Sequence, residues 1–222
     1  MLMKLSMKGI KTMNIRVNSN NGIDVIRTDQ ELFKNRKIFI EGCIDYSEAD
    51  IFIKKLLLLN IQDDKKVIDV VIDSPGSADG DIRPGLMMYD ALMTSPAPIR
   101  MFCIGRAYGI AGVLFECGGN IRLMLPNAFI SFGENRVNVP GTITAGNAAP
   151  EQPFDHTETI CELLKHYTGH SSETVKQMVE SNKVLNTQEC LRENLCDFTA
   201  GIDWLSRTYI PDEEDDDSLP FA

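Results

Sequence analysis

The sequence predicts a single α/β domain, because strand-like and helix-like segments alternate over most of its length. The strand-like segments are short and nearly continuous in aliphatic character, which is typical of strands covered on both faces. A chain of 222 residues is long enough to bury one large core. We therefore expect one domain of repeated strand–helix units, with extensions at its ends.

The strands and helices are expected in a regular order. The predicted strands lie at 37–40, 67–73, 99–104, 121–125 and 128–132. The predicted helices lie at 45–60, 86–93, 110–117 and 155–166, with two shorter ones that begin near Ser171 or Ser172 and at Thr187. In the first helix Ser47 is a fair N-cap, and Ile53, Leu56 and Leu57 are expected to form one apolar face. Gly169 is the expected C-terminal stop of the long helix, and SSET after it supplies a capping box.

The two ends of the chain differ from the domain in composition. Residues 1–35 are polar, carry a turn signal at 19–22, and are expected to form a flexible or partner-dependent arm. Residues 205–222 include an unbroken acidic run at 212–217 and are expected to be disordered. The predicted domain therefore spans 36–204. The formal net charge of −10 comes largely from the acidic run, so the domain itself is only weakly acidic.

Composition excludes several classes of function. No basic face suited to nucleic acid is expected, because the charge is concentrated at the two ends. No segment approaches the roughly 18 apolar residues needed to cross a bilayer, and the start lacks the apolar stretch of a secretory signal. The six cysteines have no CxxC spacing, which favours free core thiols in a reducing compartment. A cytoplasmic protein without a cofactor is the simplest expectation.

Four stretches carry recognisable motifs in a fixed order. They are IDSPGS with GLMMYDAL (72–92), GRAYGIAG (105–112), LPNAFISF (125–132), and the region from HYTGHSSETVKQMVES to QECLRENLCD. In this order they resemble the ClpP family's strand, glycine turn and helix, its nucleophile turn, the strand pair that leads to its catalytic histidine, and its C-terminal helical region. Each motif alone is weak, but four in register over about 36–197 imply the family's fold.

The resemblance implies a crotonase-like α/β fold with a C-terminal helical and handle region. It also implies assembly into seven-membered rings, two of which stack into a barrel fed by an AAA+ unfoldase. Expected partners are therefore copies of this chain or an active paralogue, and an unfoldase, with neither nucleic acid nor a membrane. The segment 139–154 takes the place of the handle, where Pro150 and Pro153 would interrupt a long helix. Ring stacking is thus the part of the assembly that the sequence supports least.

The family's serine–histidine–aspartate triad falls on residues of other types. The nucleophile position is Gly109, the histidine position is Gly133, and the aspartate position is Asn182. A glycine has neither an oxygen to attack a carbonyl nor an imidazole to accept a proton, and an amide cannot supply the charge that stabilises an imidazolium. Loss of the nucleophile or the base costs roughly 10⁶ in kcat in serine proteases. No catalytic residue is therefore predicted.

The backbone donors that would bind an oxyanion are also expected to be altered. The loop SPGSADGDIRPG (74–85) is longer than the corresponding loop of the family. Gly80 is therefore expected to replace the family's second glycine in a vestigial oxyanion hole. Ile110 would offer the other N–H if the helix begins at that residue.

Another side chain could act as the nucleophile. Ser131 lies two positions before Gly133 and would face the same side of its strand, but no histidine is near it in the sequence. Cys103 and Cys117 flank the site, yet apolar surroundings raise the pKa of a thiol and reduce its reactivity. Such a replacement needs a nucleophile, a base and oxyanion donors to converge by another route.

Two of the three histidines have a spacing that is compatible with metal binding. His166 and His170 have the i,i+4 spacing that can bind zinc on a helix. Gly169 lies between them and is expected to end the helix, and no third ligand is evident. No metal site is predicted.

Three functions remain open at this point. The first is a ClpP-like ring subunit without catalytic activity, with a structural or regulatory role. The apolar core of the family's fold is present in the sequence, whereas the three triad positions hold other residue types. The second is a divergent ClpP-like serine endopeptidase, of prophage type, that uses a non-standard nucleophile. The third is a binder of small acyl ligands of the wider crotonase type, for which no residue identifies an adenine-nucleotide pocket.

Overall fold

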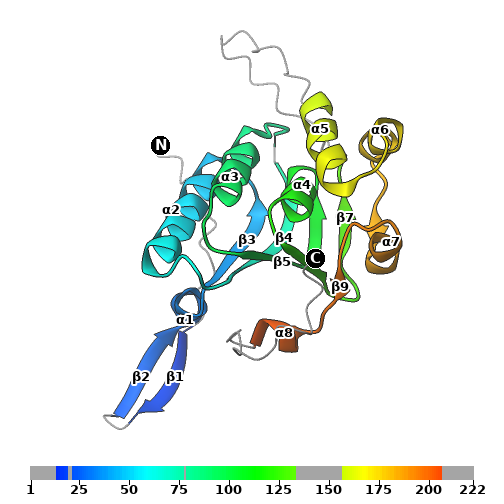
Figure 1. Ribbon diagram of the computed structural model, residues 1–222. Helices are drawn as coiled ribbons and strands as arrows, with labels where there is room; N and C mark the ends of the chain where they lie inside the picture. Colours follow the sequence, from blue (N-terminus) through cyan, green and yellow to red (C-terminus); the bar gives the residue numbers. More distant parts are fainter. Residues whose placement is uncertain (1–13, 20–21, 78, 134–156, 207–222) are drawn as a thin grey trace, which may run out of the picture. The chain divides into compact units, whose positions relative to one another are not determined.

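The computed structural model describes residues 14–19, 22–77, 79–133 and 157–206, and the chain divides into two compact units. The first unit, Met1–Lys37, contains the strands β1 (Asn14–Ser19) and β2 (Gly22–Arg27), paired antiparallel, and the helix α1 (Thr28–Lys34) (Figure 1). The turn signal in the sequence falls where β1 ends and β2 begins. The expected arm at 1–35 therefore includes regular structure that the sequence did not predict.

The second unit, Ile38–Ala222, is built on a mixed β-sheet. Among the described residues the strand order is β3-β4-β5-β6-β9, and β7 pairs with both β5 and β8. The pairs β4–β5, β5–β6, β5–β7 and β6–β9 are parallel, whereas β7–β8 is antiparallel. The strands are β3 (Lys37–Cys43), β4 (Ile68–Gly76), β5 (Ile99–Tyr108), β6 (Ile121–Met124), β7 (Phe129–Ser131), β8 (Leu185–Asn186) and β9 (Phe198–Thr199).

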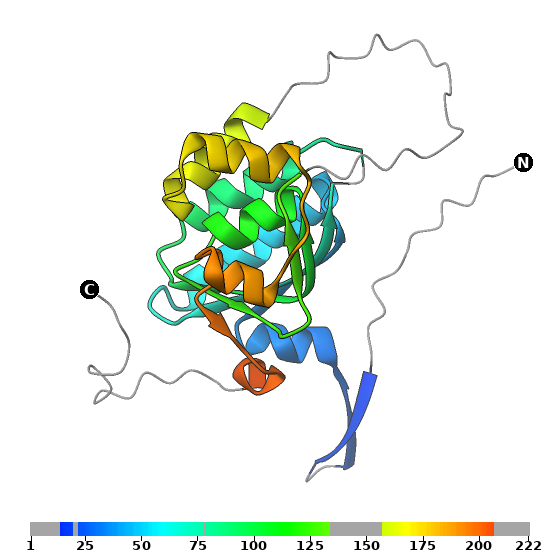
Figure 2. The same cartoon turned by 90° about the vertical axis from the view of Figure 1, so that its right-hand side faces the viewer.

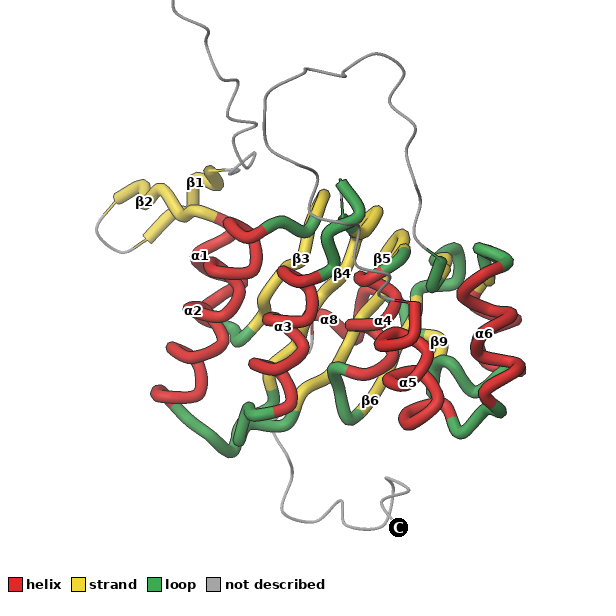
Figure 3. Tube along the Cα trace, turned by 90° about the horizontal axis from the view of Figure 1, so that it is seen from above, coloured by secondary structure: helices red, strands yellow, loops and turns green. Residues whose placement is uncertain are grey.

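Helices pack along the sheet in chain order, as Figure 3 shows for α2, α3, α4 and α5. The helices are α2 (Tyr46–Gln62), α3 (Arg83–Met93), α4 (Ile110–Cys117), α5 (Thr157–Thr168), α6 (Ser172–Glu180), α7 (Thr187–Arg192) and α8 (Ile202–Ser206). All eight residues of α4 are buried, so this short helix is the centre of the packing. The helix α5 packs on α4, and α6 packs on α5 (Figure 2). The predicted α/β class is confirmed.

The two faces of the sheet are covered by different helices. Val71, Phe102 and Leu123 are neighbours across β4, β5 and β6, and they form a buried cluster with Leu205 of α8. Because side chains alternate along a strand, their neighbours Val70 and Met101 point to the opposite face. These two residues are fully buried as well, and α4 packs against β4 and β5. Burial on both faces accounts for the nearly continuous aliphatic character of these strands.

The sequence placed the start and the buried face of α2 incorrectly. The N-cap is Asp45, whose carboxylate accepts a hydrogen bond from the Glu48 N–H at 2.9 Å, and Ser47 lies inside the helix. Leu57 is 58% exposed, and the buried side chains are instead Ala49, Phe52, Leu56 and Leu59. Their spacing of three and four residues is that of a single helical face.

Other local signals are confirmed, except the capping box expected from SSET, because the residue three positions after the Ser171 cap is Thr174 and not a glutamate. Gly169 has φ 70° directly after α5, and the Ser171 hydroxyl caps α6 by accepting from the Thr174 N–H at 3.2 Å. The strand–helix pair β5–α4 has its helix at the predicted bounds, 110–117. The handle segment 139–154 and the acidic run lie outside the described residues. Among those that are described, no helix is both long and apolar enough to cross a membrane.

Candidate functional site

The turn between β5 and α4 has an unusual backbone conformation. The strand ends at Tyr108, the helix begins at Ile110, and the single residue between them, Gly109, has φ 55° and ψ −126°. Residues with a Cβ rarely adopt a positive φ, and when they do the strain is often part of a functional site. A sharp strand-to-helix turn of this kind is the arrangement that presents the nucleophile in serine hydrolases. Here the turn is present and the residue at it is a glycine.

The strand β7 brings the second part of the site to this turn. It pairs with β5 in parallel, so that Tyr108 lies opposite Ser131. The carboxyl ends of parallel strands meet at one edge of the sheet, where ligands usually bind in α/β proteins. A Cβ atom on Gly112 of α4 would lie 2.5 Å from the Ser131 carbonyl oxygen, so α4 and the end of β7 are in close contact.

Gly133 is closed in by the end of α6. A Cβ atom at this position would lie 2.5 Å from Asn182 Oδ1, 2.7 Å from the Val179 carbonyl oxygen and 2.8 Å from Asn182 Cα. Two of these three atoms belong to the backbone, so rotation of a side chain could not relieve the contacts. The sequence placed a missing histidine at Gly133, and the structure leaves no room there for a side chain of any type.

Asn182 bonds to a serine rather than to a histidine. Its Oδ1 accepts a hydrogen bond from the Ser131 hydroxyl at 2.9 Å, and Ser131 is fully buried. Asn182 itself has φ 50°, a left-handed conformation that Asn tolerates better than most residues. The same amide oxygen faces both Ser131 and Gly133, which agrees with the expectation that these two residues share one side of the strand.

Gly76 is a residue of the site that the sequence did not single out. It has φ 88°, and a Cβ atom on it would lie 2.5 Å from the Tyr108 carbonyl oxygen and 3.7 Å from Gly109 Cα. Its N–H donates to the Ser74 hydroxyl at 3.0 Å. The signal that could have found it is its position as the glycine that ends the β4 sequence.

Gly80 and Ile110, the two residues expected to form the vestigial oxyanion hole, lie in different surroundings. Gly80 is exposed, and its N–H donates to the Ser77 hydroxyl at 3.1 Å. Ile110 is buried as the first residue of α4, where N–H groups have no acceptor within the helix. The role of Gly80 stays a prediction, whereas Gly76 is the glycine that the structure places beside Gly109.

The thiols near the site are poorly suited to attack. Burial raises the pKa of Cys103 to about 12 and also raises the pKa of Cys117 well above its ordinary value. The Cys103 Sγ is 3.8 Å from the Phe129 carbonyl oxygen. Because the thiolate is the nucleophilic form, these two side chains are almost entirely unreactive at neutral pH.

The two described histidines lie in other contacts. The ring of His166 packs edge-on against the ring of Tyr167, with the two ring centroids 4.9 Å apart. Nε2 of His170 is 2.8 Å from the Glu193 carbonyl oxygen. His156 is outside the described residues. Within the described ranges, no group of three or more His, Cys, Asp or Glu side chains could hold a metal ion.

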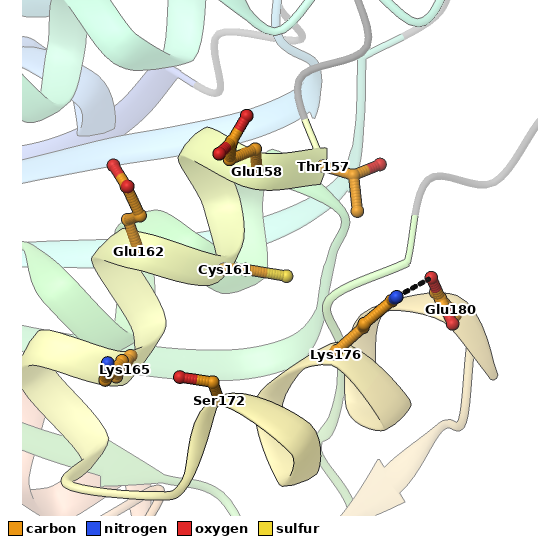
Figure 4. A pocket seen from close by; sticks show the side chains of 8 residues that line it. All are labelled: Thr157, Glu158, Cys161, Glu162, Lys165, Ser172, Lys176 and Glu180. Carbon is orange, nitrogen blue, oxygen red and sulfur yellow. Dashed lines mark ion pairs between the residues drawn. The ribbon is translucent and has the colours of Figure 1, made fainter.

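A polar groove of about 510 Å³ lies between α5 and α6 (Figure 4). It is lined by Thr157, Glu158, Cys161, Glu162, Lys165, Ser172, Lys176 and Glu180. The Nζ of Lys176 and Oε1 of Glu180 form an exposed ion pair at 3.7 Å. None of the lining residues is among those that contact Gly109 or Gly133, although Glu180 directly follows Val179.

Comparison with known proteins agrees with the motifs. The family described as Clp protease matches residues 19–200, which cover part of each unit and every residue of the candidate site. The ATP-dependent Clp protease proteolytic subunit 1 of Rhodopirellula baltica is 27% identical over 186 residues, which are 83% of this chain and 78% of that protein. The family match covers far more than half of the sequence. The chain therefore belongs to the Clp protease family.

Proposed function

We propose that this chain is a noncatalytic subunit of a Clp-type protease ring, with a structural or regulatory role. The observation that carries the proposal is the closed position at Gly133. A base cannot occupy that position while the Val179 carbonyl oxygen lies 2.7 Å from the place of its Cβ. With Gly109 at the strand-to-helix turn, the nucleophile and the base are absent from the same site.

Ser131 contacts the same Asn182 amide that faces the expected base position, and its contacts argue against a role as nucleophile. Its O–H donates to the amide oxygen of Asn182, and an amide can accept this hydrogen bond but cannot take the proton. Activation of a serine needs a base that accepts the proton as the oxygen attacks. The contacts of Ser131 thus support an inactive site.

A role within an assembly agrees with the surface of α2. Ile51, Leu57, Leu58 and Ile61 are all exposed large apolar side chains on this helix, with Ile61 at 73% exposure. A group of exposed apolar residues on one element commonly marks a protein–protein contact. Copies of this chain, or an active paralogue, are the proposed ring partners, with an AAA+ unfoldase as a further partner.

Labelling with active-site probes tests the inactive site. The purified protein is incubated with a fluorophosphonate and analysed by mass spectrometry, and we expect no adduct. Iodoacetamide should modify exposed Cys43 and half-buried Cys161 and leave buried Cys103 and Cys117 untouched. A fluorophosphonate adduct on Ser131, or rapid alkylation of Cys103 or Cys117, would instead favour a divergent peptidase.

Native mass spectrometry after affinity purification from the source cell tests the ring. A multimer of this chain, alone or mixed with a paralogue, is expected. A monomer at every concentration, without a bound partner, would contradict this part of the proposal. A thermal-shift screen with acyl-CoA tests the alternative of an acyl-ligand binder. If saturating acyl-CoA leaves the melting temperature unchanged, this alternative is excluded.

A further inference from the structure

The groove between α5 and α6 lies in a helical hairpin. Residues 169–171 alone connect the two helices, and helices joined by so short a loop pack antiparallel. The volume of the groove, about 510 Å³, falls within the usual range of small-ligand sites, ~300–1,000 Å³. Its lining residues all belong to these two helices, so one copy of the chain supplies both walls.

One face of α5 forms the first wall. Four of its residues follow the spacing i, i+3, i+4 and i+7, which places them on one side of a helix: Glu158, Cys161, Glu162 and Lys165. Cys161 is half-buried, whereas the three charged side chains are exposed. Glu162 and Lys165 are close enough in the helix to pair, yet no ion pair joins them within the described part of the chain. The ammonium group of Lys165 is therefore available to a ligand.

One face of α6 forms the second wall. Ser172, Lys176 and Glu180 follow one another at intervals of four residues and so share one side of this helix. The Nζ of Lys176 lies 3.7 Å from Oε1 of Glu180, and both side chains are more than half exposed. An exposed pair of this kind contributes little stability, so a charged ligand can compete for either member.

The two ends of the groove carry different groups. Glu158 and Glu180 lie at the end far from the connection between the helices, as Figure 4 shows. Lys165 and Ser172 lie at the end next to the connection. The first end accepts hydrogen bonds from an ammonium group, and the second donates them to a carboxylate. Glu162, one turn before Lys165, is the acidic exception at the second end.

The distance between the ends corresponds to a short peptide. Glu158 and Lys165 are seven residues apart in α5, which is about 10 Å along the helix axis. An extended chain of three residues also spans about 10 Å. A free amino acid carries the same two charges but is too short to reach both ends.

We propose that the groove binds peptides of about three residues with free termini, the ammonium group toward Glu158 and the carboxylate toward Lys165. Cys161 lies between the two ends, so a bound peptide covers its thiol without reacting with it. The inference does not depend on the proposed function, because none of the lining residues contacts Gly109 or Gly133.

The rate at which iodoacetamide alkylates Cys161 tests the inference. The purified full-length protein is treated with the reagent at increasing concentrations of triglycine, and mass spectrometry follows each thiol. We expect a saturable decrease in the Cys161 rate, with half-protection near the millimolar range for a ligand of this size. The exposed thiol of Cys43 in the same molecule is the control, and its rate should not change.

Changes in the charges of the ligand test the chemistry of recognition. Acetyl-triglycine amide has neither terminal charge. It should need about tenfold higher concentration for half-protection of Cys161, because each exposed charge pair changes an equilibrium by roughly twofold to fivefold.

Changes in the protein test the orientation of the peptide. Lys165→Met should raise the half-protection concentration of triglycine by roughly twofold to fivefold and leave that of triglycine amide, which lacks the carboxylate, unchanged. Glu158→Gln should have the same effect on triglycine and leave acetyl-triglycine, which lacks the ammonium group, unchanged. Lys54→Met on α2 is the matched control and should behave as the wild type.

Three results would overturn the inference. The first is a constant Cys161 rate at triglycine concentrations far above the millimolar range. The second is equal protection by triglycine and by acetyl-triglycine amide, in the wild type and in both groove variants. The third is an equal decrease in the rates of Cys161 and Cys43, which would place the effect on the reagent and not on the groove.

Discussion

At the scale of single residues, position 133 combines a chemical and a steric constraint. Glycine has no side chain that could accept a proton, and the backbone of Val179 and Asn182 fills the space that a side chain would need. A catalytic base at this position would need this space. The position of the α6 end is therefore compatible only with a glycine at 133. A change of one residue cannot reverse both.

The Gly133→Ala variant measures the steric constraint. We expect a loss of about 1–3 kcal/mol in the free energy of unfolding, because the new methyl group would overlap backbone atoms in a packed interior. The measurement is urea denaturation followed by circular dichroism. Adding Asn182→Gly removes the contact with Oδ1 but leaves the Val179 oxygen and the backbone of residue 182, so it should not restore the lost stability. Recovery to the wild-type value would show that the amide side chain alone closes the site.

The Gly109→Ser variant tests the chemical constraint. It restores a hydroxyl at the strand-to-helix turn, but no hydrolysis of a peptide substrate is expected, because a serine without a base is a weak nucleophile. A positive φ at Gly109 also makes a side chain there costly, so a small loss of stability is expected. Measurable turnover by this single variant would mean that another group acts as the base.

At the scale of secondary-structure elements, the network of Glu116, Arg122 and Asp197 links α4, β6 and the start of β9. Arg122 is the central member because it contacts both carboxylates and its side chain is only 13% exposed. Removing one member of a buried charged group leaves the others without compensation, which costs far more than loss of a surface pair.

Arg122→Met is therefore expected to lose about 3–5 kcal/mol of unfolding free energy at neutral pH. The matched control is Lys54→Met on α2, which breaks an exposed i,i+4 pair with Asp50 and should change stability by less than about 1 kcal/mol. Denaturant unfolding of both variants beside the wild type gives the comparison. A similar small effect for both would mean that the buried network is not important for stability.

At the scale of the whole molecule, the exposed apolar surface of α2 bears on assembly. Leu58 and Ile61 are three residues apart and so lie on one face of the helix, and both are exposed. Replacing both by serine is expected to lower the oligomeric fraction in sedimentation velocity without unfolding the protein, because neither side chain is in the core. Lys54→Ser on the same helix is the control. An unchanged distribution for the double variant would exclude this face from the contact.

Much of the fold could be predicted from the sequence, because the alternation of apolar strands and helices is a local property. The bounds of α4, the stop of α5 at Gly169 and the start of α6 at Ser171 follow from local signals of this kind. The hairpin β1–β2 was missed because its short strands are rich in polar residues. The start of α2 was misplaced by two residues because Asp45 and Ser47 are both suitable caps.

The candidate site could be predicted only in part. The residue types at 109, 133 and 182 can be read from the sequence and the family resemblance, and the strand pairing brings Tyr108 opposite Ser131. The closure of Gly133 depends on where the backbone of α6 lies against β7, which no local pattern encodes. The position of Gly76 beside Gly109 likewise depends on the pairing of β4 with β5, in which Ser74 lies opposite Ala107.

We propose that the site around Gly109 and Gly133 does not hydrolyse peptides. Turnover by the purified wild-type protein tests this directly. Casein and fluorogenic peptides are incubated with the chain, alone and with a co-purified unfoldase and ATP, beside a mock preparation that controls for contaminating proteases. No turnover above the mock preparation is expected. Turnover that exceeds it, and that increases in proportion to the amount of this chain, would contradict the account.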